Sequence, residues 1–323
     1  MAGCRPAVAR AWLLVGMVLS GVEMAQGSEV ISNNVPNNIP NNVPNIALNT
    51  TATGAQGNTR VSYALGFGAE WDAALHARDV PRVTALMRRA QGQMPQDKHG
   101  ETPLHQLPRL SQGDDAVPVM RALLASGADV HAATEHGYTA LHMAAASPCL
   151  PCLQVLLRAG AQVRLVSRNG STPLHISLPH SRAALVAAGA DIAARDKLGR
   201  VPLHTVDMPS EDLLGSSSGM GVNVVDAQGF TPLHWAAFEG RHLAIEWLLA
   251  HGANTQLRST AAYQHSDGIL AAEWASTTTY PAGQRAYDLA KAQHDSTKWS
   301  SGKFRQAWEL LDKATPRQGL FSR

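Results

Sequence analysis

The chain has few cysteines, few aromatic residues, little net charge and no apolar run long enough to cross a membrane. Aromatic residues make up 5% of its 323 residues, and only 3 are Cys. Lys and Arg together number 27 against 25 Asp and Glu, a formal net charge of +2, so no basic field favours nucleic acid or an anionic membrane as a partner. The apolar stretch Ala11–Val22 is about 12 residues long, too short to span a bilayer comfortably.

A short internal repeat is the strongest positive signal. The run Thr-Pro-Leu-His and its degenerate forms recur at intervals scattered around 33 residues. The copies are Thr102–His105, Thr139–His142, Thr172–His175, Val201–His204 and Thr231–His234.

Each copy is expected to begin a helix. Thr is a good N-cap, Pro suits the first helical position, and His at the third position can reach back to the cap. A second marker, Gly-Ala followed by Asp, Gln or Asn, comes about 22 residues later in most copies and suits the left-handed residue that ends a helix. The spacing predicts units of helix, turn, helix and a connecting loop.

With these motifs the chain resembles the ankyrin repeat family over roughly residues 69–315. The resemblance implies an all-α ankyrin repeat solenoid of about six to seven helix-turn-helix units with β-turn fingers. The stretch Trp71–Met87 is similar to an N-terminal capping repeat, and Arg285–Leu311 to a last repeat. The copy beginning at Ser167 has lost about four residues, so we expect its second helix to be short.

The N-terminus predicts export. Arg5 and Arg10 precede the apolar run, and the small residues Ala25 and Gly27 suit a cleavage site, so residues 1–27 are interpreted as a signal peptide. The protein is then expected to be periplasmic or secreted. Residues 28–68, rich in Asn and Pro, are interpreted as a disordered linker, with a recognition motif as the alternative, and residues 316–323 as a C-terminal tail.

The mature chain keeps two cysteines, Cys149 and Cys152, in a C-x-x-C spacing. In an oxidising compartment a local disulfide is expected, closing too short a loop to add much chain-entropy stabilisation. The alternative is thiol–disulfide exchange at a helix N-terminus, but the βαβ pattern typical of such redox proteins is missing.

No catalytic, metal or cofactor site is predicted. The repeat histidines belong to separate units about one helix diameter apart, too far for shared metal bonds, so helix capping is the preferred role. The string Gly215–Gly219 matches G-x-S-x-G but lies in a Ser-rich loop without the strand and helix that a nucleophile elbow needs.

Function is therefore expected at a surface, and the resemblance implies finger tips and first-helix faces that bind a protein partner. The residues assigned to this role are Tyr138, Arg168, Arg200, Phe230, Phe238 and Trp274. Trp274 belongs to an insertion, Gln256–Gln284, which is interpreted either as a partner-binding loop or as a local cap.

The leading hypothesis is a non-enzymatic, monomeric, exported scaffold for one protein partner, with an immunity-like or chaperone-like role as a specific version. Two alternatives stay open. One is a redox protein that uses Cys149 and Cys152, and the other is a secreted effector that binds a host protein.

Overall fold

The computed structural model describes residues 67–111, 115–214, 221–266, 277–296 and 302–315. The predicted signal peptide, most of the linker and the C-terminal tail lie outside these ranges and remain predictions. Phe67, counted in the linker, is buried beside the helix Ala69–His76, the first in the described residues. Within the described ranges, none of the helices is both long and apolar enough to cross a membrane.

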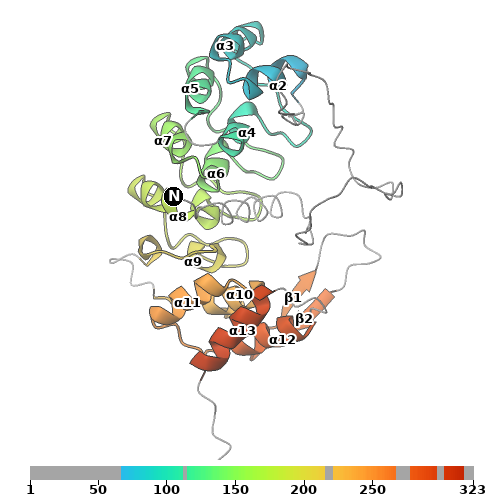
Figure 1. Cartoon of the computed structure of the whole chain (residues 1–323), viewed down its shortest axis with the longest axis vertical. Coiled ribbons are helices and arrows are strands. Elements are labelled where there is room, and N and C mark those ends of the chain that lie inside the picture. Colours follow the sequence, from blue (N-terminus) through green and yellow to red (C-terminus); the bar gives the residue numbers. More distant parts are fainter. Residues whose placement is uncertain (1–66, 112–114, 215–220, 267–276, 297–301, 316–323) are drawn as a thin grey trace, which may run out of the picture.

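In the described residues, helices pair into seven units that stack along the long axis of the molecule (Figure 1). The first and second helices of the units are, in chain order, α2 (Ala69–His76) and α3 (Val80–Arg89), α4 (Pro103–Leu110) and α5 (Val117–Ala125), α6 (Ala140–Ala145) and α7 (Leu150–Arg158), η1 (Pro173–Ile176) and α8 (Pro179–Ala187), α9 (Pro202–Thr205) and η2 (Glu211–Leu213), α10 (Pro232–Glu239) and α11 (His242–Ala250), and α12 (Ala286–Ser296) and α13 (Gly302–Ala314). The predicted all-α solenoid of six to seven units is confirmed.

The repeat histidine caps its own helix, as predicted. In the second unit, Nδ1 of His105 accepts a 3.1 Å hydrogen bond from the backbone N–H of Thr102 and lies 2.8 Å from the Thr102 hydroxyl. The other four copies form the same bond from the N-cap N–H to Nδ1. Because Nδ1 is the acceptor, the ring hydrogen lies on Nε2.

The same histidines also join each unit to the next. Nε2 of His105 donates to the carbonyl of Tyr138 at 3.0 Å, and His142 reaches Ser171 in the same way. The remaining donors and acceptors are His175 with Arg200, His204 with Phe230, and His234 with Gln284. A row of buried side-chain hydrogen bonds therefore runs along the stack.

The deletion in the fourth unit shortens its first helix, so the prediction of a short second helix was wrong. The first helix is the single 3₁₀ turn η1, whereas α8 keeps 9 residues. The reason is Pro179, because the residue before a proline avoids helical backbone angles and Leu178 is extended at φ −76° and ψ 156°. In the described part of the fifth unit, the second half is reduced to the single 3₁₀ turn η2 after α9.

A buried arginine supports these short helices. Arg182 on α8 is 1% exposed and donates to the carbonyl of Ser177 at 3.1 Å and to the carbonyl of Met208 in the fifth unit. Burial lowers the pKa of its guanidinium to about 10, so Arg182 remains charged at neutral pH. Its donors satisfy carbonyls that a longer helix would have bonded internally.

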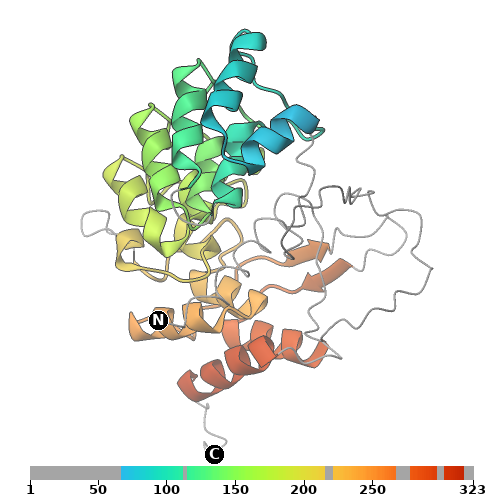
Figure 2. The same ribbon diagram turned by 45° about the horizontal axis from the view of Figure 1, so that its top comes forward.

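Two short strands form an antiparallel hairpin in the insertion, β1 (Tyr263–Ser266) with β2 (Thr277–Tyr280). The register pairs Tyr263 with Tyr280 at its base and Ser266 with Thr277 at its far end. Figures 1 and 2 show the hairpin projecting on the side of the stack opposite to the second helices α5, α7 and α8.

Candidate binding surface

A finger is the turn that leads into the first helix of a unit. Units two to seven each have one, and each finger is numbered after its unit. All six share one hydrogen-bond pattern. In the sixth finger, the N–H of Asp226 donates to the carbonyl of Phe230 at 3.0 Å, and Gly229 donates back to Asp226 at 3.2 Å. The earlier fingers are Asp97–Glu101, Thr134–Tyr138, Ser167–Ser171 and Asp196–Arg200.

A buried or half-buried side chain organises each finger from within. Oδ1 of Asp226 accepts hydrogen bonds of 2.9 Å from the backbone N–H groups of Gln228 and Phe230. Its second oxygen accepts a 2.7 Å bond from Nε1 of Trp235 on α10. In the fifth finger, Oδ1 of Asp196 likewise accepts two backbone N–H bonds. The hydroxyls of Thr134 and Ser167 each accept one backbone N–H bond in their fingers. The tips are therefore held in a defined conformation.

Neighbouring fingers are linked through their backbones. The N–H of Lys197 donates to Asn169 at 2.9 Å, and the N–H of Ala227 donates to Leu198 at 3.1 Å. The contact is close, since a Cβ added at Gly199 would lie 2.7 Å from the backbone nitrogen of Ala227. Glycine is required here because φ is +76° and the next finger occupies the space of a side chain. The fingers of units two to seven thus form one continuous ladder.

The seventh finger carries the insertion at its tip. The N–H of Ser259 donates to the carbonyl of Gln284 at 2.9 Å, and Gly283 donates back to Ser259 at 2.9 Å. Ser259 therefore corresponds to Asp226 and Gln284 to Phe230. Residues 261–282 take the place of a single residue in each of the other fingers. We call Ser259–Gln284 the extended finger.

An aromatic cluster holds the base of the extended finger. Tyr263 and Tyr280 pack edge-on against Phe238, with ring centroids 5.8 and 5.2 Å apart, and Tyr263 also lies 5.2 Å from Trp235. Tyr280 is 8% exposed, and its hydroxyl accepts a 2.9 Å hydrogen bond from Gln293 on α12. The base of the insertion therefore acts as a local cap, which was one of the two sequence-based interpretations, and the partner-binding loop remains a prediction.

Three residues assigned to partner contact are buried, and their expected exposure was wrong. Tyr138 and Phe230 are each 2% exposed, and Phe238 is 7% exposed. Tyr138 and Phe230 end their fingers just before the helix N-cap, where the chain turns back and each ring packs 5.5 Å from the repeat histidine of its own unit. Phe238 is covered by the two tyrosines of the hairpin. Their role in direct contact with a partner remains without structural support.

The two assigned arginines differ in their surroundings. Arg168 is exposed near the tip of the fourth finger. Arg200 is held by Asp196 through bonds of 2.7 and 2.8 Å, and its guanidinium lies 4.8 Å from the ring centroid of Trp235. Arg200 therefore serves the structure of the fifth and sixth fingers. Trp274 lies outside the described residues.

Burial keeps the repeat histidines neutral. It lowers the pKa of His105 and His142 to about 4 and that of His204 to about 3, and it also lowers the pKa of His175 and His234. A charged imidazole would also carry a hydrogen on Nδ1 and lose its backbone donor. Within the described residues, no group of three or more His, Cys, Asp or Glu is placed to hold a metal ion.

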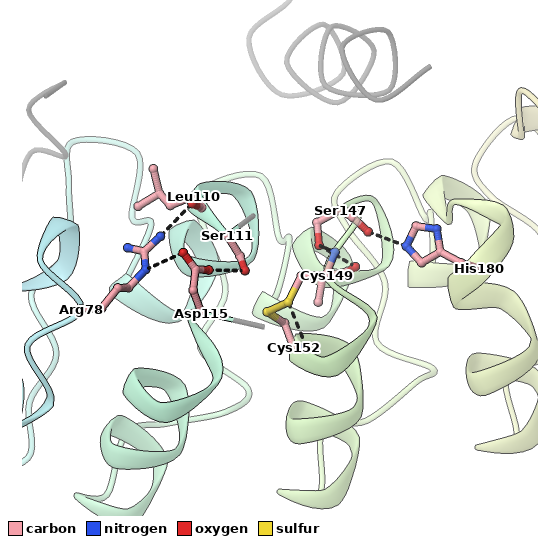
Figure 3. The surroundings of a disulfide bond; sticks show 9 residues. Arg78, Leu110, Ser111, Asp115, Ser147, Cys149, Cys152 and His180 are labelled. Atoms are coloured by element: carbon pink, nitrogen blue, oxygen red, sulfur yellow. Dashed lines mark hydrogen bonds and ion pairs between the residues drawn. A yellow bond between two sulfur atoms is a disulfide. The ribbon is translucent and has the colours of Figure 1, made fainter. Parts of the chain in front are cut away.

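The two cysteines lie together at the start of α7 (Figure 3). Their Cα atoms are 5.3 Å apart with the sulfurs at bonding distance, and both side chains are fully buried. Cys149 is the N-cap, and its sulfur accepts from the N–H of Cys152 at 3.2 Å. His180 of the next unit donates to the carbonyl of Ser147 at 2.9 Å beside the pair. This geometry suits a disulfide, and the burial of both sulfurs leaves none exposed for attack on a substrate.

Sequence reasoning assigned Arg168, which follows the buried Ser167, but missed the exposed residues that precede the buried residue in the fourth, fifth and sixth fingers. Val166 is 54% exposed and Val225 is 45% exposed, and Arg195 between them is exposed as well. Each stands one residue before the buried Ser or Asp, so aligning the copies on that position would have shown them to be equivalent.

Comparison with known proteins identifies the repeats. Residues 110–196 match a model of three ankyrin repeats, and residues 228–260 match a single ankyrin repeat. Two curated plant proteins also match in part. The calmodulin-binding transcription activator CBT of Oryza sativa subsp. japonica is 33% identical over 32% of this chain, and calmodulin-binding transcription activator 6 of Arabidopsis thaliana is 39% identical over 23%. The matched regions span 11% and 9% of those proteins, about a tenth of their length.

Two solved structures are similar at low scores. The ankyrin repeat domain of Bcl-3 is 26% identical, with a TM-score of 0.46 over 59% of this chain and 90% of that one. The complex of the predatory endopeptidase Bd0816 from Bdellovibrio bacteriovorus with the immunity protein Bd3460 gives 20% identity and a TM-score of 0.43, over 65% of this chain and 97% of the matched chain. The assignment therefore rests on the repeat models and on the hydrogen-bond pattern above: this chain carries ankyrin repeats, stacked as an ankyrin repeat solenoid.

Proposed function

We propose that this chain is a non-enzymatic scaffold that binds one protein partner through its fingers, with the extended finger as the main contact. Ankyrin repeats imply protein–protein interaction, and no enzyme family is among the matches described above. The observation that carries the proposal is the site of the insertion. It departs from a fingertip of the ladder, on the side opposite to the second helices, and its base is fixed by Tyr263 and Tyr280.

The location of the insertion favours binding because its base is rigid. An ordered base lowers the entropy cost of presenting a loop to a partner. A purely structural cap would need only the two tyrosines and the strand pairing beside them. The chain instead extends past the last paired residues, Ser266 and Thr277, by a segment that includes Trp274, a residue type common among binding hot spots.

We further propose that the partner is met outside the cytoplasm. The support is the sequence alone, in the charged start, the short apolar run and the small residues Ala25 and Gly27. An immunity-like role would make the partner a toxin, and a chaperone-like role would make it an exported enzyme. Mass spectrometry of the native protein tests export, because an intact Met1 terminus in a cytosolic fraction would contradict it.

The test of the binding surface removes the far part of the extended finger and keeps its base. Residues 267–276 are replaced by Asn-Gly, which suits the two-residue turn between Ser266 and Thr277. Tyr263 and Tyr280 stay in place, so helical content and melting temperature should be unchanged. Capture of the partner from the exported fraction by the tagged chain should fall at least tenfold.

A matched control changes the opposite side of the stack. Gln154 and Arg158 are exposed on α7, and Q154A with R158A should leave capture within about twofold, because surface residues outside an interface contribute little. Loss of capture in this control with full capture by the shortened finger would overturn the proposed surface.

A further inference from the structure

The fourth, fifth and sixth fingers present a continuous exposed surface without a carboxylate. The residues on either side of the buried finger residue point outward, because side chains alternate along an extended segment. In the fourth finger Val166 and Arg168 are exposed and Ser167 is buried, and the next two fingers repeat this order around Asp196 and Asp226. We call the six exposed residues the finger face: Val166, Arg168, Arg195, Lys197, Val225 and Ala227.

The finger face carries three cations and three apolar side chains. In the described part of the chain, no acidic side chain forms an ion pair with Arg168, Arg195 or Lys197. The two carboxylates of these fingers are buried and already used, Asp196 by Arg200 and backbone N–H groups, and Asp226 by Trp235 and backbone N–H groups. Val166 and Val225 are two of the four large hydrophobic residues that are most exposed in the described residues.

Backbone and side-chain bonds hold these groups in register. Consecutive fingers are joined by the N–H of Lys197 to Asn169 and by the N–H of Ala227 to Leu198. Arg195 lies across the joint between the fifth and sixth fingers, because one guanidinium nitrogen donates to the carbonyls of Gly199 at 2.5 Å and Val225 at 3.0 Å. The backbone positions of the finger face are therefore fixed relative to one another, and among its cations the Arg195 side chain is held by hydrogen bonds.

We infer that the finger face binds an extended acidic segment of the partner protein in which apolar side chains alternate with Glu or Asp. Carboxylates of such a segment complement Arg168, Arg195 and Lys197, and its apolar side chains cover Val166 and Val225. Charge complementarity gives this surface orientation and a fast encounter, and the valines exclude water between the charged contacts. This inference rests on the proposed scaffold function and adds the chemistry of the partner.

The experiment uses the full chain and a fluorescein-labelled peptide of alternating Glu and Val, with binding followed by anisotropy. Exposed charge pairs are strongly screened at high ionic strength, so affinity should fall at least tenfold between about 50 mM and about 500 mM salt. R168E with K197E should weaken binding at least tenfold, and V166S with V225S about fivefold, with circular dichroism unchanged in both variants.

The matched control reverses two exposed cations of the second helices, Arg121 on α5 and Arg158 on α7. R121E with R158E makes the same change in net charge and should leave affinity within twofold. Equal weakening in this control would show a non-specific charge effect and overturn the inference. Equal or tighter binding of a Lys–Val peptide, or of single-stranded oligothymidine, would overturn it as well.

The two proposals fail in different ways. If the shortened extended finger loses the natural partner but the full chain does not bind the Glu–Val peptide, the scaffold function stands and the acidic partner chemistry is wrong. If the peptide binds and R168E with K197E abolishes its binding, the finger face stands even where the extended finger proves dispensable for capture.

Discussion

Nε1 of Trp235 donates a 2.7 Å hydrogen bond to the carboxylate of Asp226, which ties the inner face of α10 to the finger that precedes it. The other carboxylate oxygen accepts two backbone N–H groups of that finger. One buried side chain thus sets the finger conformation and the position of the aromatic cluster beneath the extended finger.

Removing this carboxylate should destabilise the protein. We expect D226A to lower the free energy of unfolding by about 2–4 kcal/mol, because buried N–H donors lose a charged acceptor. W235F removes only one of these bonds and keeps the aromatic packing, so its cost should be about 1 kcal/mol. Urea unfolding followed by circular dichroism measures both, and a D226A variant as stable as the wild type would contradict this role.

Acid should unfold the protein through its buried histidines. At a pH well above 6.5 the repeat histidines are neutral in the folded and unfolded states. Between pH 6.5 and about 4 the repeat histidines bind protons in the unfolded chain but stay neutral in the folded chain, since the folded pKa of His105 and His142 is about 4. Stability should therefore fall as the pH falls through this window, by up to about 1.4 kcal/mol per pH unit for each histidine.

The slope of the unfolding free energy against pH counts these protons. At pH 5 we expect an uptake of about three to five on unfolding, and H204Q should lower it by about one, because His204 has its folded pKa lowered to about 3. His251 is half-buried, and its pKa is raised by the carbonyl of Trp247 and by Glu211. It is therefore charged in both the folded and unfolded states at pH 5, and H251Q is the control that leaves the slope at that pH unchanged. A flat profile from pH 6.5 to 5 would contradict the prediction.

In an internal finger, glycine should be needed both for its positive φ and for the close approach of the next finger. In the last finger of the ladder only the positive φ should require it. G199A places a Cβ 2.7 Å from the nitrogen of Ala227 and must also hold φ +76°, so we expect a loss of about 2–4 kcal/mol. At Gly283 φ is +83° but no atom of the described residues lies within 4 Å of an added Cβ, so G283A should cost about 1 kcal/mol. Thermal unfolding compares the two variants. Equal losses of stability would show that the neighbouring finger moves to make room for the added Cβ.

The cysteine pair should be oxidised and structural. Ellman titration of the denatured exported protein without reductant should find no free thiol at Cys149 or Cys152. C149A with C152A should lower the free energy of unfolding by no more than about 2 kcal/mol, since the closed loop is short, and should leave partner capture intact. Turnover in an insulin reduction assay that disappears in this variant would instead support the redox alternative.

The sequence alone determined the repeat architecture. Helix starts, helix ends and histidine capping depend on residues within a few positions of one another, and Thr102 with His105 is a case in which spacing along the chain decides the contact. The sequence also showed the extra length of the last repeat and the C-x-x-C spacing of Cys149 and Cys152 at a helix start.

Only the tertiary structure decided which residues are exposed and where the extra length is placed. Tyr138 and Phe230 resemble exposed finger residues by position, but their rings turn inward onto the helix that follows, and Phe238 is covered by tyrosines more than 20 residues further along the chain. The insertion was located at a fingertip only by the bond between Ser259 and Gln284. The bonds from each histidine to the next unit were not predictable either, because local sequence specifies a helix, whereas burial and lateral hydrogen bonds depend on which segments the stack brings together.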